Sequence, residues 1–284
     1  MNGKARHLRS VYVLQSHRAV DNAHIYELFG RRNRKLKKYT LEICADSVES
    51  ALIAAEHGAD RVELCSNMII GGTTPSQKLF EGIRKYSDID IRVLIRPRYG
   101  DFFYSKYELD IMREEIAMFT QMGAEGIVTG VLSCDGNLDR EAMEYVLGNR
   151  TETSKVTLHR AFDMCSQPLR AMEDAVDIGV DTILTSGQQN NCIKGLDLLA
   201  QLKLAAGDRI DILVGSGVNS DNVVKIWKAT GITSFHLSAK EIIESNMKFR
   251  NPNINMGIKG FNEYSIYRTS GTEVDKVIRK LEGL

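Results

Sequence analysis

The chain lacks any long hydrophobic run. No stretch of 18 apolar residues occurs in its 284 residues, so the sequence predicts no membrane-spanning helix and no membrane partner. The pattern of a secretory signal peptide, a charged start followed by an apolar segment and a small-residue cleavage site, is also missing. We therefore expect a cytoplasmic protein, and its 43% hydrophobic content is sufficient for a large globular core.

The sequence also lacks the short motifs that mark common cofactor sites. Its five cysteines form no CxxC pair and no Cys/His zinc spacing, which argues against a structural zinc site and against a disulfide framework. Scattered free thiols of this kind are typical of a reducing compartment. No GxGxxG motif follows the first predicted strand, where ADSVES stands instead, so we expect no nucleotide cofactor.

Charge is uneven along the chain although the net charge is zero. Residues 1–39 hold ten Lys and Arg against only Asp21 and Glu27, and their run RRNRKLKK has no amphipathic period. We interpret this segment as a basic leader that is disordered or reflects an incorrectly assigned start, since Leu36 leads directly into the first predicted strand. A nucleic-acid-binding arm is the functional alternative, but no basic, aromatic-bearing body supports it, and we expect no nucleic-acid partner.

A weak repeat organises the rest of the chain, residues 40–284. Four times, a glycine that fits a helix C-terminus precedes a short β-branched run suited to a buried parallel strand. These glycines are Gly58, Gly123, Gly179 and Gly231. Helical patterns separate these runs from four further candidate strands, which are residues 41–44, 91–96, 155–160 and 211–215. Eight alternating strands and helices predict a single-domain α/β fold, the TIM (β/α)8 barrel, with an open doubly wound sheet as the alternative.

Two neighbouring predicted strands carry the same unusual pair of side chains. Glu42 and Cys44 lie in LEICA, and Glu63 and Cys65 lie in RVELC. Adjacent parallel strands are about 4.8 Å apart, so the sequence predicts two carboxylates and two thiols on one surface. A thiol pair at this spacing can bind a soft metal or close a disulfide, whereas a single free cysteine is more often a small core residue.

The other predicted strand ends are polar as well, and in a TIM barrel the carboxyl ends of the strands form the active site. The candidate catalytic residues are Glu63, Arg96, Arg98, Asp101, His159 and Asp163. By strand alternation we expect His159 to share a face with Thr157, Ala161 and Asp163, and Arg160 to point elsewhere; Arg96 and Arg98 share a face if their strand extends that far. The alternative is a structural network in which Glu42 and Glu63 neutralise arginines inside the barrel.

A glycine-rich turn follows the seventh predicted strand. Gly215, Ser216 and Gly217 precede a helix there, at the position where TIM barrels often bind phosphate. We expect this turn, with His236 and Ser238 from the eighth strand end, to bind an anion. Short glycine-rich turns are common, so a purely structural turn is the alternative.

A set of longer motifs spans the chain from about residue 40 to its end. They are LEICADSVESA, GADRVELC, GGTTPS, IRPRYGDFFY, DGNLD, LHRAFDM, ILTSG and FHLSA, and with them the sequence resembles the CutC copper-homeostasis family. The resemblance implies a TIM barrel, a cytoplasmic location, copper binding or copper tolerance, and a tendency to form homo-oligomers. The family's proposed copper ligands correspond to Cys44 and Cys65, and two thiolates in near-linear geometry suit Cu(I). The chain departs from the family pattern in ILVGSGV, where Ser216 stands in place of a glycine.

Three function classes follow from these residues. We predict first a copper-homeostasis protein that binds Cu(I) through Cys44 and Cys65. The alternative is a TIM-barrel enzyme, in which arginines hold a small anionic metabolite while His159 and Glu63 or Asp163 transfer protons. A scaffold that depends on surface residues is the third. A copper-binding protein is expected to lose its function in Cys44→Ser and Cys65→Ser and to keep it in His159→Ala. An enzyme is expected to keep its function in the cysteine variants and to lose it in His159→Ala.

Overall fold

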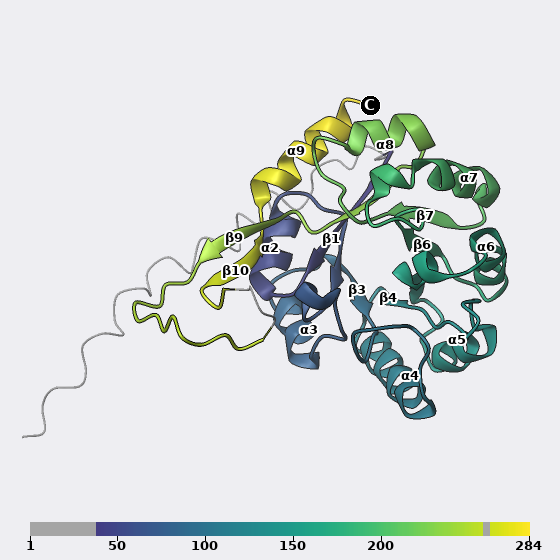
Figure 1. Cartoon of the computed structure of the whole chain (residues 1–284), viewed down its shortest axis with the longest axis horizontal. Coiled ribbons are helices and arrows are strands. Elements are labelled where there is room, and N and C mark those ends of the chain that lie inside the picture. Colours follow the sequence, from purple (N-terminus) through teal and green to yellow (C-terminus); the bar gives the residue numbers. More distant parts are fainter. Residues whose placement is uncertain (1–37, 258–261) are drawn as a thin grey trace, which may run out of the picture. The chain divides into compact units, whose positions relative to one another are not determined.

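Eight parallel strands close into a barrel in their sequence order, which confirms the predicted TIM barrel (Figure 1). The structure is a computed structural model and describes residues 38–257 and 262–284. The strands are β1 (Thr40–Ala45), β2 (Arg61–Leu64), β3 (Asp90–Leu94), β4 (Gly126–Thr129), β5 (Lys155–Leu158), β6 (Thr182–Thr185), β7 (Asp211–Val214) and β8 (Ser234–Leu237). The basic leader expected over residues 1–39 lies outside the described residues except for its last two positions.

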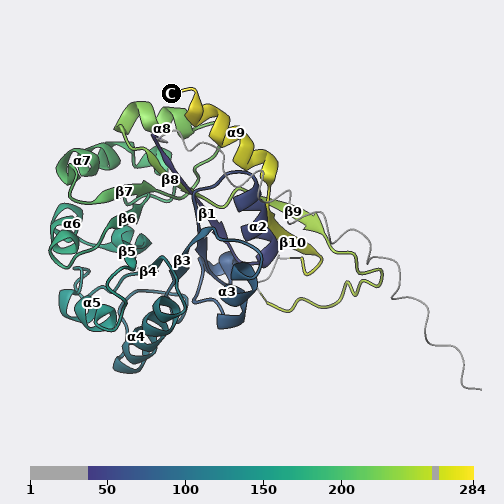
Figure 2. The same ribbon diagram turned by 180° about the vertical axis from the view of Figure 1, so that it is seen from behind.

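Helices surround the barrel, as the view from behind also shows (Figure 2). They are α2 (Val48–Glu56), α3 (Gln77–Arg84), α4 (Lys106–Gln121), α5 (Arg140–Leu147), α6 (Pro168–Asp177), α7 (Leu196–Ala206), α8 (Val223–Thr230) and α9 (Gly271–Glu282). Local sequence sets their ends. Ser105 and Glu108 form a reciprocal capping box at the start of α4, and Gly231 ends α8 in the left-handed conformation. None of the helices within the described ranges is long and apolar enough to cross a membrane.

Each barrel strand presents one face to the helices and the other to the barrel interior. In β1, Leu41 and Ile43 are fully buried in the hydrophobic core between the strands and the helices. The alternating residues Glu42 and Cys44 face inward instead, and Cys44 contributes to a small separate cluster with Cys65. The period of two along the strand therefore delivers the polar side chains to the inside of the barrel.

Two predicted strands end earlier than expected. β3 ends at Leu94, because the backbone of Arg96 bonds to Thr74 in the loop after β2 rather than to β4. The expected pairing of Arg96 and Arg98 by alternation therefore does not apply. β5 ends at Leu158, and a 3-10 helix, η2 (Arg160–Met164), follows at once. The prediction that alternation continues through His159 to Asp163 was wrong, because this turn replaces the extended backbone.

A two-stranded hairpin after the barrel was not predicted. β9 (Lys240–Glu244) pairs antiparallel with β10 (Ser265–Thr269), and the hairpin lies outside the ring of helices beside α2 (Figures 1 and 2). All five residues of β9 are exposed, so its sequence shows no alternation between buried and exposed positions. Since alternation is the main signal for a strand, the sequence offered little to find it.

Candidate metal centre and the mouth of the barrel

A cavity of about 700 Å³ opens at the carboxyl ends of the strands. Of the residues singled out in the sequence, those that line it are Cys44, Glu63, Cys65, Arg96, His159, Asp163, Ser216, Gly217, His236 and Ser238. Gly215, Arg98 and Asp101 are not among the residues that line it. Arg160, which alternation had directed elsewhere, also lines the cavity.

The two thiols lie together at one side of this cavity. Sγ of Cys44 is 3.6 Å from Sγ of Cys65, and both side chains are buried against Leu94 and Val128. In the register of the barrel, Cys44 lies opposite Glu63, and Cys65 follows one residue after β2 ends. The expectation that the two Glu-x-Cys pairs share one surface therefore agrees with the geometry.

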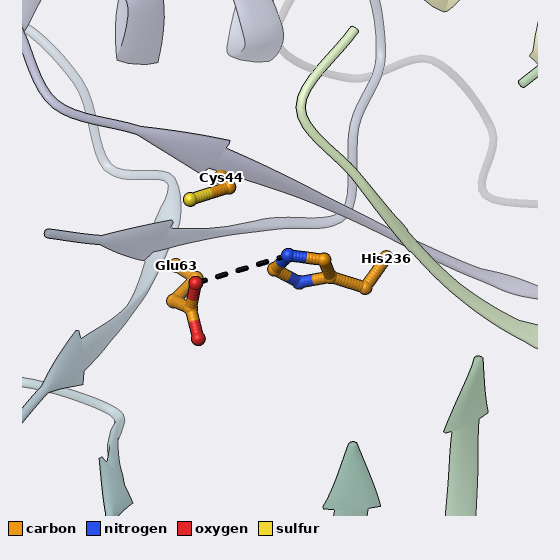
Figure 3. A group of neighbouring side chains, drawn as sticks. All are labelled: Cys44, Glu63 and His236. Carbon is orange, nitrogen blue, oxygen red and sulfur yellow. Dashed lines mark ion pairs between the residues drawn. The ribbon is translucent and has the colours of Figure 1, made fainter. Parts of the chain in front are cut away.

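The two carboxylates are joined by an imidazole. His236 pairs with Glu42 in the ladder between β8 and β1, and its Nδ1 lies 2.7 Å from Oε1 of Glu42. Its Nε2 lies 3.8 Å from Oε2 of Glu63, the ion pair drawn in Figure 3. On its other side Glu42 accepts a hydrogen bond of 2.5 Å from Nε of Arg61. Basic and acidic side chains therefore alternate in one buried network across the adjacent strands β8, β1 and β2.

The surroundings of these charged groups shift the pKa values of Glu42 and Glu63 in opposite directions. Burial alone raises the pKa of Glu42, but Arg61 and His236 outweigh it and hold the pKa at about 2. The pKa of Glu63 is raised, mainly by burial and further by the charge of Glu42, despite the opposing effect of His236. Burial lowers the pKa of His236, yet the charge of Glu63 and hydrogen bonds to Cys44 and Glu42 raise it well above its usual value. These shifts favour the protonated form of His236 between the two acids.

Cys44, Glu63 and His236 form the group of side chains that could hold a metal ion. The sulfur of Cys44, a carboxylate oxygen of Glu63 and a ring nitrogen of His236 all lie within 4.8 Å of one another, and Figure 3 shows the three side chains gathered together. The pKa of the Cys44 thiol is raised well above its usual value by its hydrogen bond with Cys65 and by burial. A metal would therefore have to displace protons from both the thiol and the imidazole before it binds them.

From the sequence we predicted His236 as part of an anion site rather than beside the thiols. The missing signal was the closure of the barrel, which makes β8 the neighbour of β1 although 194 residues separate His236 from Glu42. An eight-stranded barrel always pairs its first and last strands. The inward position of His236 on the last strand could thus have been used to find it.

His159 lies on the other side of the barrel, at the end of β5. Its Nδ1 accepts a hydrogen bond of 3.2 Å from the backbone N–H of Ala161, and its ring lies against Phe102 with centroids 4.8 Å apart. Gly130 makes room for the ring, because a Cβ there would lie 2.8 Å from Nδ1 of His159. Burial, assisted by the charge of Arg96, lowers the pKa of His159 to about 3, so the imidazole is neutral.

Asp163 serves as an anchor for Arg160. Its Oδ2 accepts a hydrogen bond of 2.7 Å from Nε of Arg160, and its carboxylate also accepts bonds from Thr185, Ser186 and Gln188. So many donors hold the Asp163 carboxylate in one orientation. The contacts favour a positioning role for Asp163 over proton transfer.

Two of the candidate arginines tie down loops at the mouth. Arg96 donates to the carbonyls of Gly71, Gly72 and Gly100, and so joins the loop after β2 to the loop after β3. Arg98 donates to Glu108, to Asp101 and to the carbonyl of Phe103, which closes the loop after β3 onto the start of α4. Arg98 and Asp101 therefore shape the wall of the cavity from outside.

The turn after β7 contributes backbone to the cavity. Ser216 and Gly217 both have positive φ, at 66° and 85°, and a Cβ at Gly217 would collide with the amide of Asn191. Ser216 adopts the left-handed conformation without being glycine, and its hydroxyl donates to the carbonyl of Asn190. The serine that departs from the family pattern is thus accommodated by the neighbouring loop.

The fold and this cluster define a (β/α)8-barrel protein with a thiol pair, an imidazole and two carboxylates at its mouth. The CutC family matches residues 39–241, and the chain belongs to that family. It is 40% identical over 237 residues to the human copper homeostasis protein cutC homolog, covering 83% of this chain and 86% of the human one.

Bacterial relatives agree with this assignment. A CutC family protein from Bacteroides thetaiotaomicron is 42% identical over 250 residues, which cover 88% of this chain and 99% of the relative. A solved CutC structure from Streptococcus agalactiae is 32% identical, has a TM-score of 0.67 and covers 70% of this chain and 98% of its own. The resemblance inferred from the motifs is confirmed.

Proposed function

We propose that the protein binds Cu(I) through Cys44 and Cys65 and serves copper homeostasis. The observation that carries this proposal is the buried pair of sulfur atoms 3.6 Å apart at the side of an open cavity. Soft thiolate ligands select Cu(I) and zinc over hard cations. The relatives named for copper homeostasis support the same use.

The separation of the sulfurs favours a bent rather than a linear site. With metal–sulfur bonds of about 2.3 Å, a linear pair of thiolates would need its sulfurs about 4.6 Å apart. Sulfurs 3.6 Å apart correspond instead to an angle of about 100° at the metal. Such an angle leaves space for a third ligand, and we assign that place to Nε2 of His236, with Glu63 beside it.

An anaerobic competition titration of the full chain with Cu(I) tests the proposal. We expect one Cu(I) per chain, lost in Cys44→Ser and in Cys65→Ser. Cys134→Ser is the matched control, because Cys134 is exposed and remote from the pair, and it should bind as the wild type does. A parallel titration with Zn²⁺ measures whether the same site binds zinc, the other metal that thiolate ligands select. Equal Cu(I) binding by all three variants would contradict the proposal.

The proposed setting is the reducing cytoplasm, because all five cysteines are free thiols in the structure and a metal-binding pair must stay reduced. Homo-oligomer formation is part of the same proposal. The segment joining β9 to β10 exposes Met247, Phe249 and Met256, and exposed apolar clusters of this kind mark contact surfaces.

A second copy of the chain is the partner that suits this segment. An apolar groove of about 860 Å³ is lined in part by Ile69 and Ile70, by Ile266 of β10 and by Met256 of the segment itself. Segment and groove therefore form one continuous face, which is available for reciprocal contacts between two copies. Sedimentation velocity tests this. Phe249→Lys should shift the protein toward monomer, while Tyr107→Lys, at an equally exposed aromatic on α4, should not. An unchanged distribution in Phe249→Lys would exclude the hairpin as the contact.

A further inference from the structure

We propose that the cavity contains a second subsite, formed by His159 and Arg160, that binds a small organic anion through its carboxylate or phosphate oxygens. This subsite is separate from the thiol pair. It does not depend on copper binding, and either site can be present without the other.

The first observation is an unpaired donor. Nδ1 of His159 already accepts the N–H of Ala161, so the proton of the neutral ring sits on Nε2. That Nε2 is buried and has no hydrogen-bond partner among the residues that the structure describes, although the side chain, only 4% exposed, lines the cavity. An unpaired buried donor costs about 1–3 kcal/mol. A ligand oxygen in the cavity would satisfy it.

The second observation is a fixed cation that lines the same cavity. Arg160 donates through Nε to Asp163 and through Nη2 to Ser186 and to the carbonyl of Gln189. These bonds fix the plane of the guanidinium, while Nη1 has no partner within the described parts of the chain. The side chain is 43% exposed and lines the cavity. A pre-oriented guanidinium with free N–H groups is the usual partner of a carboxylate or a phosphate.

The position of the two residues separates them from the thiols. β5 stands opposite β1 in a closed barrel of eight strands taken in order, so His159 and Arg160 face Cys44 across the mouth. A metal held by the thiols needs only one wall of this space. The volume of about 700 Å³ lies within the range of small-molecule sites, and the polar groups converge from the loops after β5, β6 and β7.

A neutral histidine donor has a defined chemical use. An N–H on an uncharged imidazole can polarise a carbonyl or carboxylate oxygen without transferring a full charge to it, as in TIM-barrel isomerases that keep a histidine neutral. The arginine supplies the charge that the ligand requires. The pair therefore suits a small metabolite with an anionic group and a neighbouring oxygen acceptor.

The test is a titration of the full chain, labelled with ¹⁵N in histidine, with two probes, malonate and inorganic phosphate. Long-range ¹H–¹⁵N spectra of the free protein should show His159 as the Nε2–H form. We expect at least one probe to give a saturable shift of the His159 Nε2 signal, and the choice of probe distinguishes a carboxylate from a phosphate ligand. In Arg160→Gln the apparent dissociation constant should rise about tenfold or more, since a charge-assisted hydrogen bond is lost.

Matched variants separate this subsite from the metal site and from general destabilisation. Arg209→Gln removes an exposed arginine that pairs with Glu173, and it should bind as the wild type does. The double variant Cys44→Ser/Cys65→Ser should also retain anion binding, so failure of the copper proposal would leave this result untouched. His159→Gln keeps an N–H donor and, by isothermal titration calorimetry with the probe that binds the wild type, should bind more tightly than His159→Leu. The proposal is overturned if neither probe shifts His159 at about 10 mM, ten times a millimolar dissociation constant, or if Arg160→Gln and Arg209→Gln behave alike.

Discussion

Nδ1 of His236 lies 2.7 Å from Oε1 of Glu42, a fully buried carboxylate on the neighbouring strand. Glu42 also receives the guanidinium of Arg61, so one acid holds two cationic groups inside the barrel. The pair connects the structural interior of the barrel with the candidate metal site above it. Changes at Glu42 should therefore affect both stability and the orientation of His236.

Replacing Glu42 by glutamine should strongly destabilise the protein. The change leaves Arg61 buried without its counter-charge, and removal of one partner from a buried ion pair typically costs about 3–5 kcal/mol. Urea unfolding measures the loss. Glu49→Gln removes an exposed carboxylate from its pair with the half-buried Arg268 and should cost less than about 1 kcal/mol. Equal losses in the two variants would show that Glu42 is not a central support.

Replacing His236 by glutamine should weaken Cu(I) binding by about tenfold to hundredfold without abolishing it, the range found when groups around a metal are altered. The thiol pair remains, but the third ligand and its orientation by Glu42 are lost. Anaerobic competition titration reads the change. His57→Gln serves as the control because His57 pairs with Asp275 at the surface. An unchanged affinity in His236→Gln would leave a site of two thiolates alone.

His159 should make stability fall as the medium becomes acidic. Its folded pKa of about 3 lies below the usual value near 6.5, so the unfolded chain binds the proton first. The stabilisation is present above pH about 6.5 and is lost as the pH falls toward 3, at up to about 1.4 kcal/mol per pH unit.

Urea unfolding between pH 5 and 6.5 tests this, since the window lies above the range in which Glu42 titrates. The slope of the wild type should exceed that of His159→Gln in this window. Parallel slopes would mean that His159 titrates normally in the folded protein.

Gly130→Ala should destabilise the protein by about 1–3 kcal/mol, the usual cost of overpacking a buried site. The added methyl group would lie 2.8 Å from the ring of His159 and from the side chain of Leu158. Thermal unfolding measures the effect, and the Nε2 signal of His159 should move as the ring is displaced. Gly257→Ala adds a methyl group in open space and is expected to change neither quantity, whereas similar behaviour of the two variants would remove Gly130 as the support of the ring.

Sequence alone determined the architecture and much of the site. The glycines that end helices, the short β-branched runs and their alternation with helical patterns predicted eight strands, because these are local properties of backbone and side chain. The same local logic identified Cys44, Glu63 and Cys65 as neighbours, since consecutive parallel strands must lie side by side. The extent of β3 and β5 was predicted less well, because the backbone of Arg96 bonds to Thr74 of the loop after β2 and because the 3-10 helix η2 follows β5.

Tertiary structure decided the relationships that depend on closure of the barrel. The contact of His236 with Glu42 requires β8 to return beside β1, and no local pattern reports a neighbour 194 residues away. The distance of 3.6 Å between the sulfurs depends on the register of β1 and β2, in which Cys44 lies opposite Glu63. Cys65 lies one residue beyond the end of β2. The neutral state of His159 comes from burial beneath Phe102 and beside Arg96, a low-dielectric environment that exists only when the loops at the barrel mouth are assembled.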